Sequence, residues 1–460
     1  MSAGHPTKAR APSAHPLPPS HTPTTTPPLT PPQGSFGTFP RTVRDTLRSF
    51  QDASEARPDP FIRYTYPKAL DASRAALAPI LNAPVDTLVF VPNATTGINT
   101  ILRSLVFNPG DTILYFATIY GACEKTVEYI TETTPASAVK VQYTYPISND
   151  ALLSLFLSAI AAEQSAGRTV KIAIFDTIAS LPGVRMPFER LTAACRAAGI
   201  LSCIDGAHAV GHIPLDLGRL DPDFFVSNCH KWLFVPRGCA VLYVPVRNQA
   251  LIRSTLPTSH GFVPKPKSVE GEGESEEIIN PLPTKEGKSA YVTGFEFVGT
   301  VDSAPYLCVS AALEYRRSLG GEDAVMKYCH GLARKAGKLV AERLGTRVME
   351  NEEGTLGACC FSNVALPLDL EGLKGLGEGR GERVADAELG IKVRDWLTLR
   401  MVEEYDTFMA LIFYDNVWWV RLSAQVYLDL DDFERGAEIL KKLCDRVKEG
   451  GFLQEAASAT

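Results

Sequence analysis

The sequence predicts an α/β fold in which helices cover a mainly parallel sheet, followed by a smaller α+β domain. Three observations support this. The chain has 460 residues, 45% of them hydrophobic, which is enough for two lobes with a large core. From about residue 60, helical stretches alternate with runs that are apolar in succession, as fully buried strands are. The second half adds shorter strand-like runs between helices.

In chain order, the first 33 residues are dominated by Pro, Thr, Ser and His, so we predict a disordered tail. Basic residues precede the first acidic residue, Asp45, and suggest a mitochondrial presequence. Prolines in this stretch disfavour the amphipathic helix that import needs, so a cytoplasmic location is the favoured prediction. The predicted strands of the main sheet then follow, at residues 87–91, 112–116, 171–175, 200–204, 223–226 and 240–244.

Residues 264–289 are rich in Gly, Pro, Glu and Lys and predict a long mobile surface loop. Residues 366–385 predict a Gly- and charge-rich insertion. The second half is otherwise assigned to helices at 304–318, 322–344 and 431–448 and to strand-like runs at 358–366 and 408–422.

Composition excludes several classes of function. A formal charge of −6 gives no electrostatic reason to expect nucleic acid or an anionic membrane as partner. No apolar run approaches the roughly 20 residues of a membrane helix. Ten cysteines are scattered without metal-ligand spacing, which indicates reduced, buried thiols and no metal site.

The strongest functional signal is Lys231 in SNCHKW, directly after the apolar run PDFFV. A lysine at the end of a buried strand is costly as a charged group and needs a partner or a chemical use. A desolvated amine loses its proton more easily and becomes a nucleophile toward an aldehyde, as in a Schiff base. In isolation, Lys231 would more often be a surface lysine.

Asp205 ends another predicted strand, in GILSCIDGAHAVG. In open α/β sheets, ligands bind at such carboxyl ends. Pyridoxal phosphate withdraws electrons while its ring nitrogen is protonated, and a carboxylate beside that nitrogen keeps it so. Asp205 alone could be a turn or capping residue, but Asp205 and Lys231 together predict a pyridoxal-phosphate site.

The run TLVFVPNATTGINTIL adds a strand that leads into Thr95 and Thr96 at a helix start. Amides and hydroxyls at a helix N-terminus can hold a phosphate, although Thr also caps helices elsewhere. The motif supports a phosphate site because it precedes Asp205 and Lys231 in the chain.

With these motifs the chain resembles the class V aminotransferase-like group of fold-type I pyridoxal-phosphate enzymes. Within that group it is most similar to isopenicillin N epimerase-like proteins and to the fungal hercynylcysteine sulfoxide lyases of ergothioneine biosynthesis. The resemblance rests on QGSFGTFP at 33–40, NATTGINT at 93–100, IYGACEKT at 119–126, DGAHAVG at 205–211, SNCHKWLFVPRGCAVLYVPVRNQALIRSTLPTSHGFVP at 227–264, FEFVGTVD at 295–302 and VRLSAQVY at 420–427.

The resemblance implies a large cofactor-binding domain at 61–303, with a seven-stranded sheet, and a small domain at 304–460. Residues 34–60 would contribute to the small domain and to the active-site entrance. Thr300 would reach the phosphate of the neighbouring subunit, which implies a homodimer with shared active sites.

The resemblance also implies roles for single residues. Lys231 would hold the cofactor and move the proton, and Asp205 would bind the ring nitrogen. His208 would lie beside the ring hydroxyl, and Tyr120 would be a stacking group or acid. The phosphate would be held by Thr95, Thr96, His230 and Asn228. Arg421 would bind the substrate α-carboxylate, and Ser35 would also contact the substrate. Asn228 and Gln33 depart from the pattern, because relatives often have a small hydroxyl residue and a histidine there.

The implied reaction is β-elimination from a cysteine-conjugate sulfoxide, hercynylcysteine sulfoxide, to a sulfenic acid, pyruvate and ammonia. A cysteine desulfurase needs a nucleophilic cysteine on a mobile loop, and the loop 264–289 contains none. Another class V reaction, such as epimerisation or transamination, is the alternative among enzymes. A non-catalytic binding or assembly protein is the alternative outside enzymes, but it would not need Lys231, Asp205 and Arg421 together.

Overall fold

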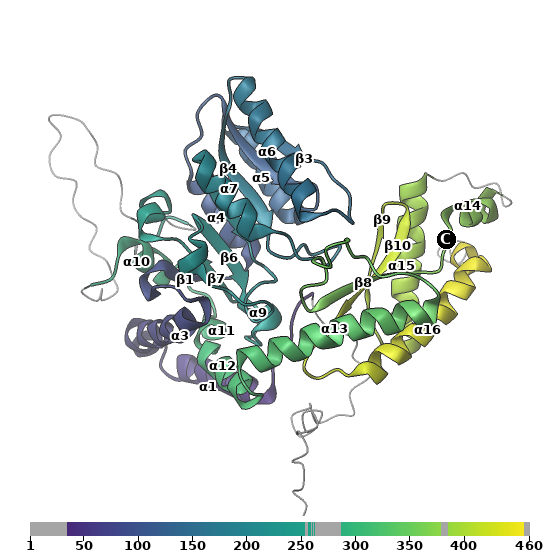
Figure 1. The fold of residues 1–460 in the computed structure, drawn as a ribbon. Helices are drawn as coiled ribbons and strands as arrows, with labels where there is room; N and C mark the ends of the chain where they lie inside the picture. Colours follow the sequence, from purple (N-terminus) through teal and green to yellow (C-terminus); the bar gives the residue numbers. More distant parts are fainter. Residues whose placement is uncertain are drawn as a thin grey trace, which may run out of the picture.

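The first half of the chain forms a seven-stranded sheet in the order β1-β7-β6-β5-β4-β2-β3 (Figure 1). The computed structural model describes residues 35–253, 256–258, 260, 262, 287–378 and 385–454. Strands β2 to β6 pair in parallel, while β7 is antiparallel to both β6 and β1. The strands are β1 (Leu88–Val91), β2 (Asp111–Phe116), β3 (Ser137–Val141), β4 (Thr169–Asp176), β5 (Leu201–Asp205), β6 (Phe224–Asn228) and β7 (Ala240–Tyr243).

Helices cover both faces of this sheet because its central strands are apolar on both sides. Alternate residues of one strand enter different cores: Ile113 of β2 packs with one group of helices and Leu114 with the other. The first group is α4 (Ala94–Ser104), α5 (Gly121–Thr133) and α10 (Ala290–Glu296). The second includes α3 (Tyr66–Leu81), α6 (Asn149–Ser165), α7 (Phe188–Ala198) and α12 (Val309–Ser318).

The C-terminal region has a second, antiparallel sheet in the order β8-β10-β9. Its strands are β8 (Phe361–Ala365), β9 (Ala410–Tyr414) and β10 (Val417–Ser423). The 23-residue helix α13 (Glu322–Leu344) runs from α12 to this sheet and packs on β8 and α16 (Leu430–Lys448) (Figure 1). The sheet also contacts α15 (Asp386–Tyr405). The predicted α/β fold with a mainly parallel sheet and an α+β region is confirmed.

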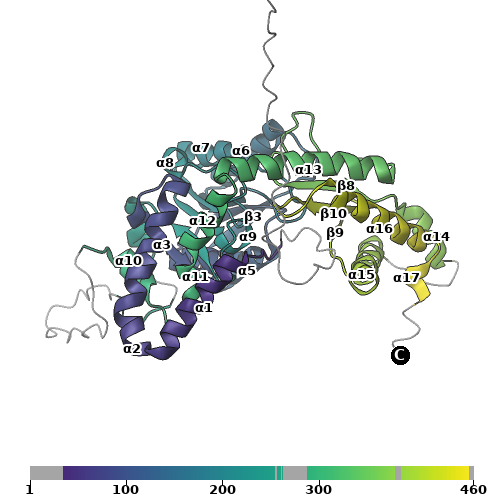
Figure 2. The ribbon, with the colours of Figure 1, turned by 90° about the horizontal axis from the view of Figure 1, so that it is seen from below.

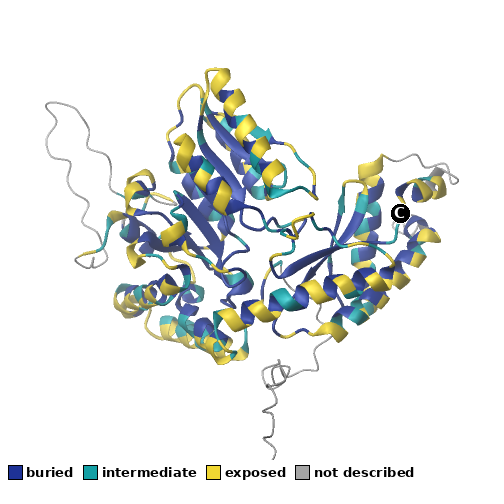
Figure 3. Ribbon diagram, viewed as in Figure 1, coloured by how far each residue is buried: buried dark blue, intermediate teal, exposed yellow. Residues whose placement is uncertain are grey.

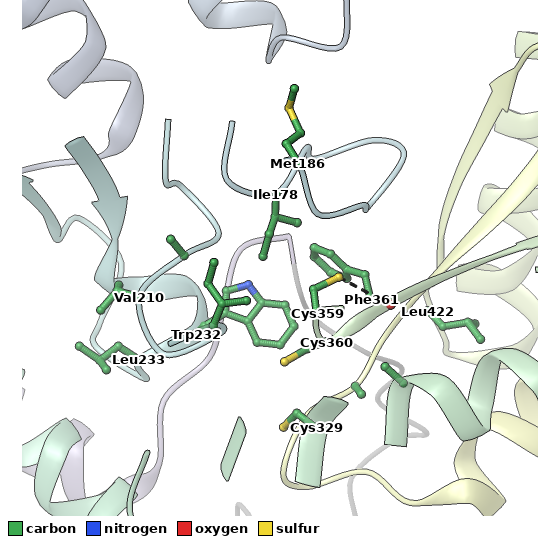
Figure 4. Packing of buried hydrophobic residues seen from close by; sticks show 14 of the residues in the cluster. Ile178, Met186, Val210, Trp232, Leu233, Cys329, Cys359, Cys360, Phe361 and Leu422 are labelled. Atoms are coloured by element: carbon green, nitrogen blue, oxygen red, sulfur yellow. Dashed lines mark hydrogen bonds between the residues drawn. The ribbon is translucent and has the colours of Figure 1, made fainter. Parts of the chain in front are cut away.

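The strands of both sheets are mostly buried (Figure 3), and side chains from the two sheets contact one another. Trp232 of α9 (Cys229–Trp232) meets Phe361 of β8 edge to face, with ring centroids 5.3 Å apart (Figure 4). Because Trp232 follows Lys231 directly, this contact fixes the helix that carries the lysine against the second sheet.

The N-terminal helix α1 (Arg41–Ala56) packs against α11 (Ala304–Leu307) and α12 (Figure 2). The remaining α-helices are α2 (Pro58–Pro60), α8 (Leu217–Leu220), α14 (Leu370–Glu378) and α17 (Gly451–Gln454). The π-helix η2 (Phe61–Thr65) and the 3-10 helices η3 (Val85–Thr87) and η4 (Val246–Leu251) complete the described elements. None of the helices in the described ranges is long and apolar enough to span a membrane. The domain boundaries at residues 33, 60 and 303 stay a prediction.

Three expectations need correction. The strand β3 was missed, because SAVKV at this edge of the sheet is half exposed and has no continuous apolar run. The insertion 366–385 is in part the helix α14, whose Leu373 is buried. The helix at 304–318 is interrupted at Cys308, which separates α11 from α12. The predicted tail and most of the loop 264–289 lie outside the described residues.

Candidate active site

Three neighbouring parallel strands end in polar residues at one edge of the large sheet. Asp176 ends β4, Asp205 ends β5 and Asn228 ends β6, and α9 with Lys231 follows at once. Asp176 and Asp205 are direct partners in the parallel register. This edge is where an open α/β sheet binds its ligand, and the chain places an amine and two carboxyl groups there.

The amine of Lys231 lies 3.0 Å from Nε2 of His208. Burial lowers the pKa of Lys231 to about 8; the charge of Asp205 opposes this effect, and that of Arg421 adds to it. His208 is buried, and its Nδ1 accepts a hydrogen bond from Nε1 of Trp232 at 3.2 Å. Burial holds the pKa of His208 well below its usual range. A neutral His208 therefore carries its proton on Nε2 and donates it to an unprotonated Lys231.

Both carboxylate oxygens of Asp205 have a protein donor. Oδ1 accepts from the backbone N–H of Ala207 at 2.9 Å, and Oδ2 accepts from Sγ of Cys123 at 3.3 Å. Burial, and then the charge of Asp205, raise the pKa of Asp176 well above its usual range. Burial therefore favours the neutral form of Asp176.

Sequence reasoning missed Asp176 and Cys123. Asp176 had a usable signal, since it follows the apolar run 171–175 as Asp205 follows 200–204. Cys123 had no usable signal, because a cysteine in an amphipathic helix cannot be distinguished from other apolar residues of the helix. Thr177 was missed as well. Its buried hydroxyl has no hydrogen-bond partner within the described part of the chain.

The N-terminus of α4 lies beside this edge and is capped by Asn93, whose Oδ1 accepts from the backbone N–H of Thr96 at 2.8 Å. Oδ1 of Asn228 accepts from the backbone N–H of Ala94 at 2.9 Å, which ties the helix to β6. A Cβ at Gly97 would lie 2.6 Å from Cγ1 of Val226, so a glycine is needed for this close approach. Asn228 thus holds the helix, while Thr95 and Thr96 lie in its first turn.

His230 lies beside Lys231 on α9, and its Nδ1 is 2.9 Å from the carbonyl oxygen of Cys239. Burial lowers the pKa of His230 to about 4, so the ring is neutral. With Nδ1 donating to a carbonyl oxygen, the neutral ring leaves Nε2 as an acceptor.

Arg421 of β10 brings the second sheet to the site. One terminal nitrogen donates to the backbone oxygen of Ser180 at 2.5 Å, and the other donates to Oγ of Ser35 at 2.7 Å. The guanidinium lies over the ring of Phe361, 4.4 Å from its centroid. Burial lowers the pKa of Arg421 to about 10, and its Nε has no partner among the described residues. A buried cation with a free donor is suited to a carboxylate ligand.

The segment that carries Ser35 continues across the lysine helix. Gly37 has φ +71°, and a Cβ there would lie 1.7 Å from the backbone oxygen of His230. Its own carbonyl oxygen accepts from Arg237 at 3.2 Å. Residues 35–39, here called the N-terminal strap, therefore contact both α9 and Arg421.

Two predicted site residues do not join this cluster within one chain. Tyr120 precedes α5 with a half-exposed side chain, and Thr300 is exposed in the turn after α10. Neither side chain makes a hydrogen bond to the cluster in the described parts of the chain. Those same parts contain no group of three His, Cys, Asp or Glu residues that could hold a metal ion.

These residues fit pyridoxal phosphate. The cofactor needs an amine that loses its proton, a carboxylate for its ring nitrogen and donors for its phosphate. Lys231, Asp205 and the first turn of α4 provide them at one sheet edge. The buried hydroxyl of Thr177 and Nε of Arg421 have no partner among the described residues, and a bound ligand can satisfy both groups. The fold and the site together define a fold-type I pyridoxal-phosphate enzyme.

The comparisons agree. The model of the family described as aminotransferase class-V matches residues 62–367. An L-cysteine desulfhydrase-like protein of Epichloe uncinata, lolT1, is 37% identical over 422 residues, covering 90% of this chain and 92% of the relative. Hercynylcysteine sulfoxide lyase of Schizosaccharomyces pombe is 29% identical, covering 89% and 93%. The solved structure of the cystine C–S lyase C-DES with cysteine persulfide has a TM-score of 0.64 at 17% identity, covering 91% and 98%.

The chain therefore belongs to the class V aminotransferase family, and its cofactor is pyridoxal 5′-phosphate. Its relatives include carbon–sulfur lyases and cysteine desulfhydrase-like proteins. The predicted family, fold and cofactor are confirmed. The roles of the single residues stay predictions.

Proposed function

We propose that this enzyme is a carbon–sulfur lyase that eliminates the sulfur group from the β-carbon of a cysteine-conjugate sulfoxide. The proposed substrate is hercynylcysteine sulfoxide, as in ergothioneine biosynthesis. The products are a sulfenic acid and an aminoacrylate, which water converts to pyruvate and ammonia. The 29% identical lyase of Schizosaccharomyces pombe supports this substrate.

One observation favours elimination over a reaction in which a cysteine of the enzyme accepts the sulfur. All ten cysteines are buried, and none offers an exposed thiol that could accept sulfur. Burial raises the pKa of Cys123 and of Cys203, the cysteines nearest to Asp205, which removes the reactive thiolate form. A site without a thiolate can still break the carbon–sulfur bond by proton removal and departure of the sulfur group.

The bound cofactor withdraws electrons from the α-carbon of an attached amino acid. Asp205 would hold the proton on the ring nitrogen, and Thr95 and Thr96 would hold the phosphate. His230 would join them as a donor only in its protonated form, because its neutral ring leaves Nε2 as an acceptor. Arg421 binds the α-carboxylate with two parallel hydrogen bonds, one of them replacing its bond to Ser35. Asn228 acts on the phosphate by fixing the N-terminus of α4.

Lys231 removes the α-proton, because burial lowers its pKa to about 8 and a larger share of its amine is neutral than in an ordinary lysine. His208 holds that amine through Nε2, and it lies beside the ring hydroxyl. Tyr120 stacks on the cofactor and donates a proton to the departing sulfenate. The partner subunit's Thr300 completes the phosphate contacts, so the proposal includes a homodimer. It also includes a cytoplasmic location.

L-Cysteine is the second candidate substrate, because the 37% identical relative is a cysteine desulfhydrase-like protein. The same residues would then release hydrogen sulfide in place of a sulfenic acid.

Product analysis separates these reactions. The holoenzyme is incubated in turn with hercynylcysteine sulfoxide and L-cysteine, and pyruvate, ammonia and the sulfur product are measured. The proposal expects stoichiometric pyruvate and ammonia from the sulfoxide, with a higher kcat/KM than for cysteine, and none from the Lys231→Ala variant. If the intact amino acid were recovered with inverted configuration, the reaction would be epimerisation and the proposed elimination would be wrong.

A further inference from the structure

We propose that Cys123 is a positioning residue that fixes the carboxylate of Asp205 against the cofactor ring. The inference rests on the proposed function only through the role of Asp205 at the ring nitrogen. It gives a role to a buried thiol that the reaction itself does not use.

The geometry begins with the two bonds at Asp205. The backbone N–H of Ala207 holds Oδ1 and the thiol of Cys123 holds Oδ2, at 2.9 and 3.3 Å. One donor on each oxygen prevents rotation of the carboxylate about its Cβ–Cγ bond. Each oxygen keeps a second lone pair, so the group still accepts from a ring N–H.

Cys123 also connects two sides of the site. Its backbone N–H donates to the carbonyl oxygen of Tyr120 at 2.8 Å, within the first turn of α5. Tyr120 is the proposed stacking group, and Asp205 the proposed partner of the ring nitrogen. Cys123 is therefore bonded through its backbone to the proposed stacking residue and through its side chain to the proposed partner of the ring nitrogen.

The surroundings favour a neutral donor at this position. The side chain of Cys123 is buried, and burial, then the charges of Asp205 and Asp176, keep its pKa far above the usual range. The other titratable groups near Asp205 are Asp176, whose pKa burial raises well above its usual range, and Lys231. Cys123 therefore remains a thiol that donates to Asp205 and adds no negative charge beside the ring nitrogen.

The test compares two substitutions at this position with a matched control. Cys123→Val removes the donor and adds one heavy atom, whereas Cys123→Ser keeps a donor and loses volume. Cys195 on α7 is an equally buried thiol with no contact to Asp205, so Cys195→Val controls for the loss of a buried sulfur. Cofactor affinity is measured by equilibrium dialysis on each folded variant without substrate.

We expect about fivefold to tenfold weaker cofactor binding for Cys123→Val, near-parental binding for Cys123→Ser and no change for Cys195→Val. In an Asp205→Asn background the same Cys123→Val change should shift affinity less than about twofold, because its target is gone. Equal affinities for the Ser and Val variants, or an undiminished loss in the Asn background, would overturn the inference.

If Cys123→Val does not fold, Cys123→Ala replaces it, because that change only removes an atom. No lyase assay enters this experiment. Failure of the substrate proposed above would therefore leave the dialysis result, and with it the role of Cys123, undisturbed.

Discussion

Lys231 and His208 form a pair in which the histidine donates and the lysine accepts. Burial produces both halves of this arrangement, because it lowers the pKa of each side chain. At pH 7 an amine with a pKa of about 8 is neutral in roughly one molecule in ten, against fewer than one in a thousand for an ordinary lysine. Burial thus makes a neutral lysine amine available as a base, and no other strong base is needed to deprotonate it.

This pKa predicts the pH dependence of cofactor attachment. The neutral amine is the attacking form, so the rate at which the apoenzyme takes up pyridoxal phosphate should rise with pH and level off above about 8. Stopped-flow absorbance between pH 6 and 10 measures it. Asp205→Asn should move the midpoint down, because the charge of Asp205 raises the pKa of Lys231. A rate still rising nearly tenfold between pH 8 and pH 9 would mean an ordinary lysine.

Arg421 gives the second prediction at this scale. A planar guanidinium grips a carboxylate through two bonds that Lys cannot reproduce, and hydrogen bonds to charged groups contribute about 1.5–3 kcal/mol each. Arg421→Lys should therefore raise KM for amino-acid substrates roughly tenfold to a hundredfold, with the cofactor absorbance unchanged. Arg347→Lys, at an exposed arginine over Trp419, is the control. A parental KM would place the carboxylate elsewhere.

Lys231 and Asp205 could be found from the sequence because a polar residue at the end of an apolar run is conspicuous. Arg421 needed the family resemblance, because VRLS alone reads as a strand. Its bond to Ser35 joins residues 386 positions apart, and no local pattern encodes such a contact.

Among the elements, the N-terminal strap depends on one glycine. Gly37→Ala would place a Cβ against the His230 carbonyl at positive φ, so α9 or the strap must move. We expect weaker cofactor binding and a kcat lower by about tenfold or more. Gly167→Ala is the control. Gly167 has the same φ of +71° but open space around it, so this change introduces backbone strain without a clash. Equal effects of the two variants on kcat would show that the strap does not position α9.

The sheet could be predicted because buried strands are apolar in succession, and six of its seven strands were located within a few residues. The edge strand β3 lacked this signal, since its first two residues are exposed. In α14, glycine and charge suggested a loop, but Leu370 and Leu373 bury an apolar side of the segment. Tertiary packing decided where local composition was ambiguous.

For the molecule as a whole, the central question is whether two chains build each site. Thr300 is exposed in its own chain, so Thr300→Val should leave the fold unchanged. If its hydroxyl reaches the partner subunit's phosphate, cofactor affinity should fall about threefold to tenfold in a dimer verified by sedimentation. Thr133→Val, at an exposed threonine on α5, is the control. An unchanged affinity would remove Thr300 from the site.

The most direct test of the account is the place where the cofactor is attached. Borohydride reduction of the holoenzyme fixes the cofactor on its lysine, and mass spectrometry of the digest then locates it. We predict one phosphopyridoxyl group per chain, on Lys231, and none in the Lys231→Ala variant. A label on a different lysine, or a labelled Lys231→Ala protein, would contradict the assignment of Lys231 and with it the proposed mechanism.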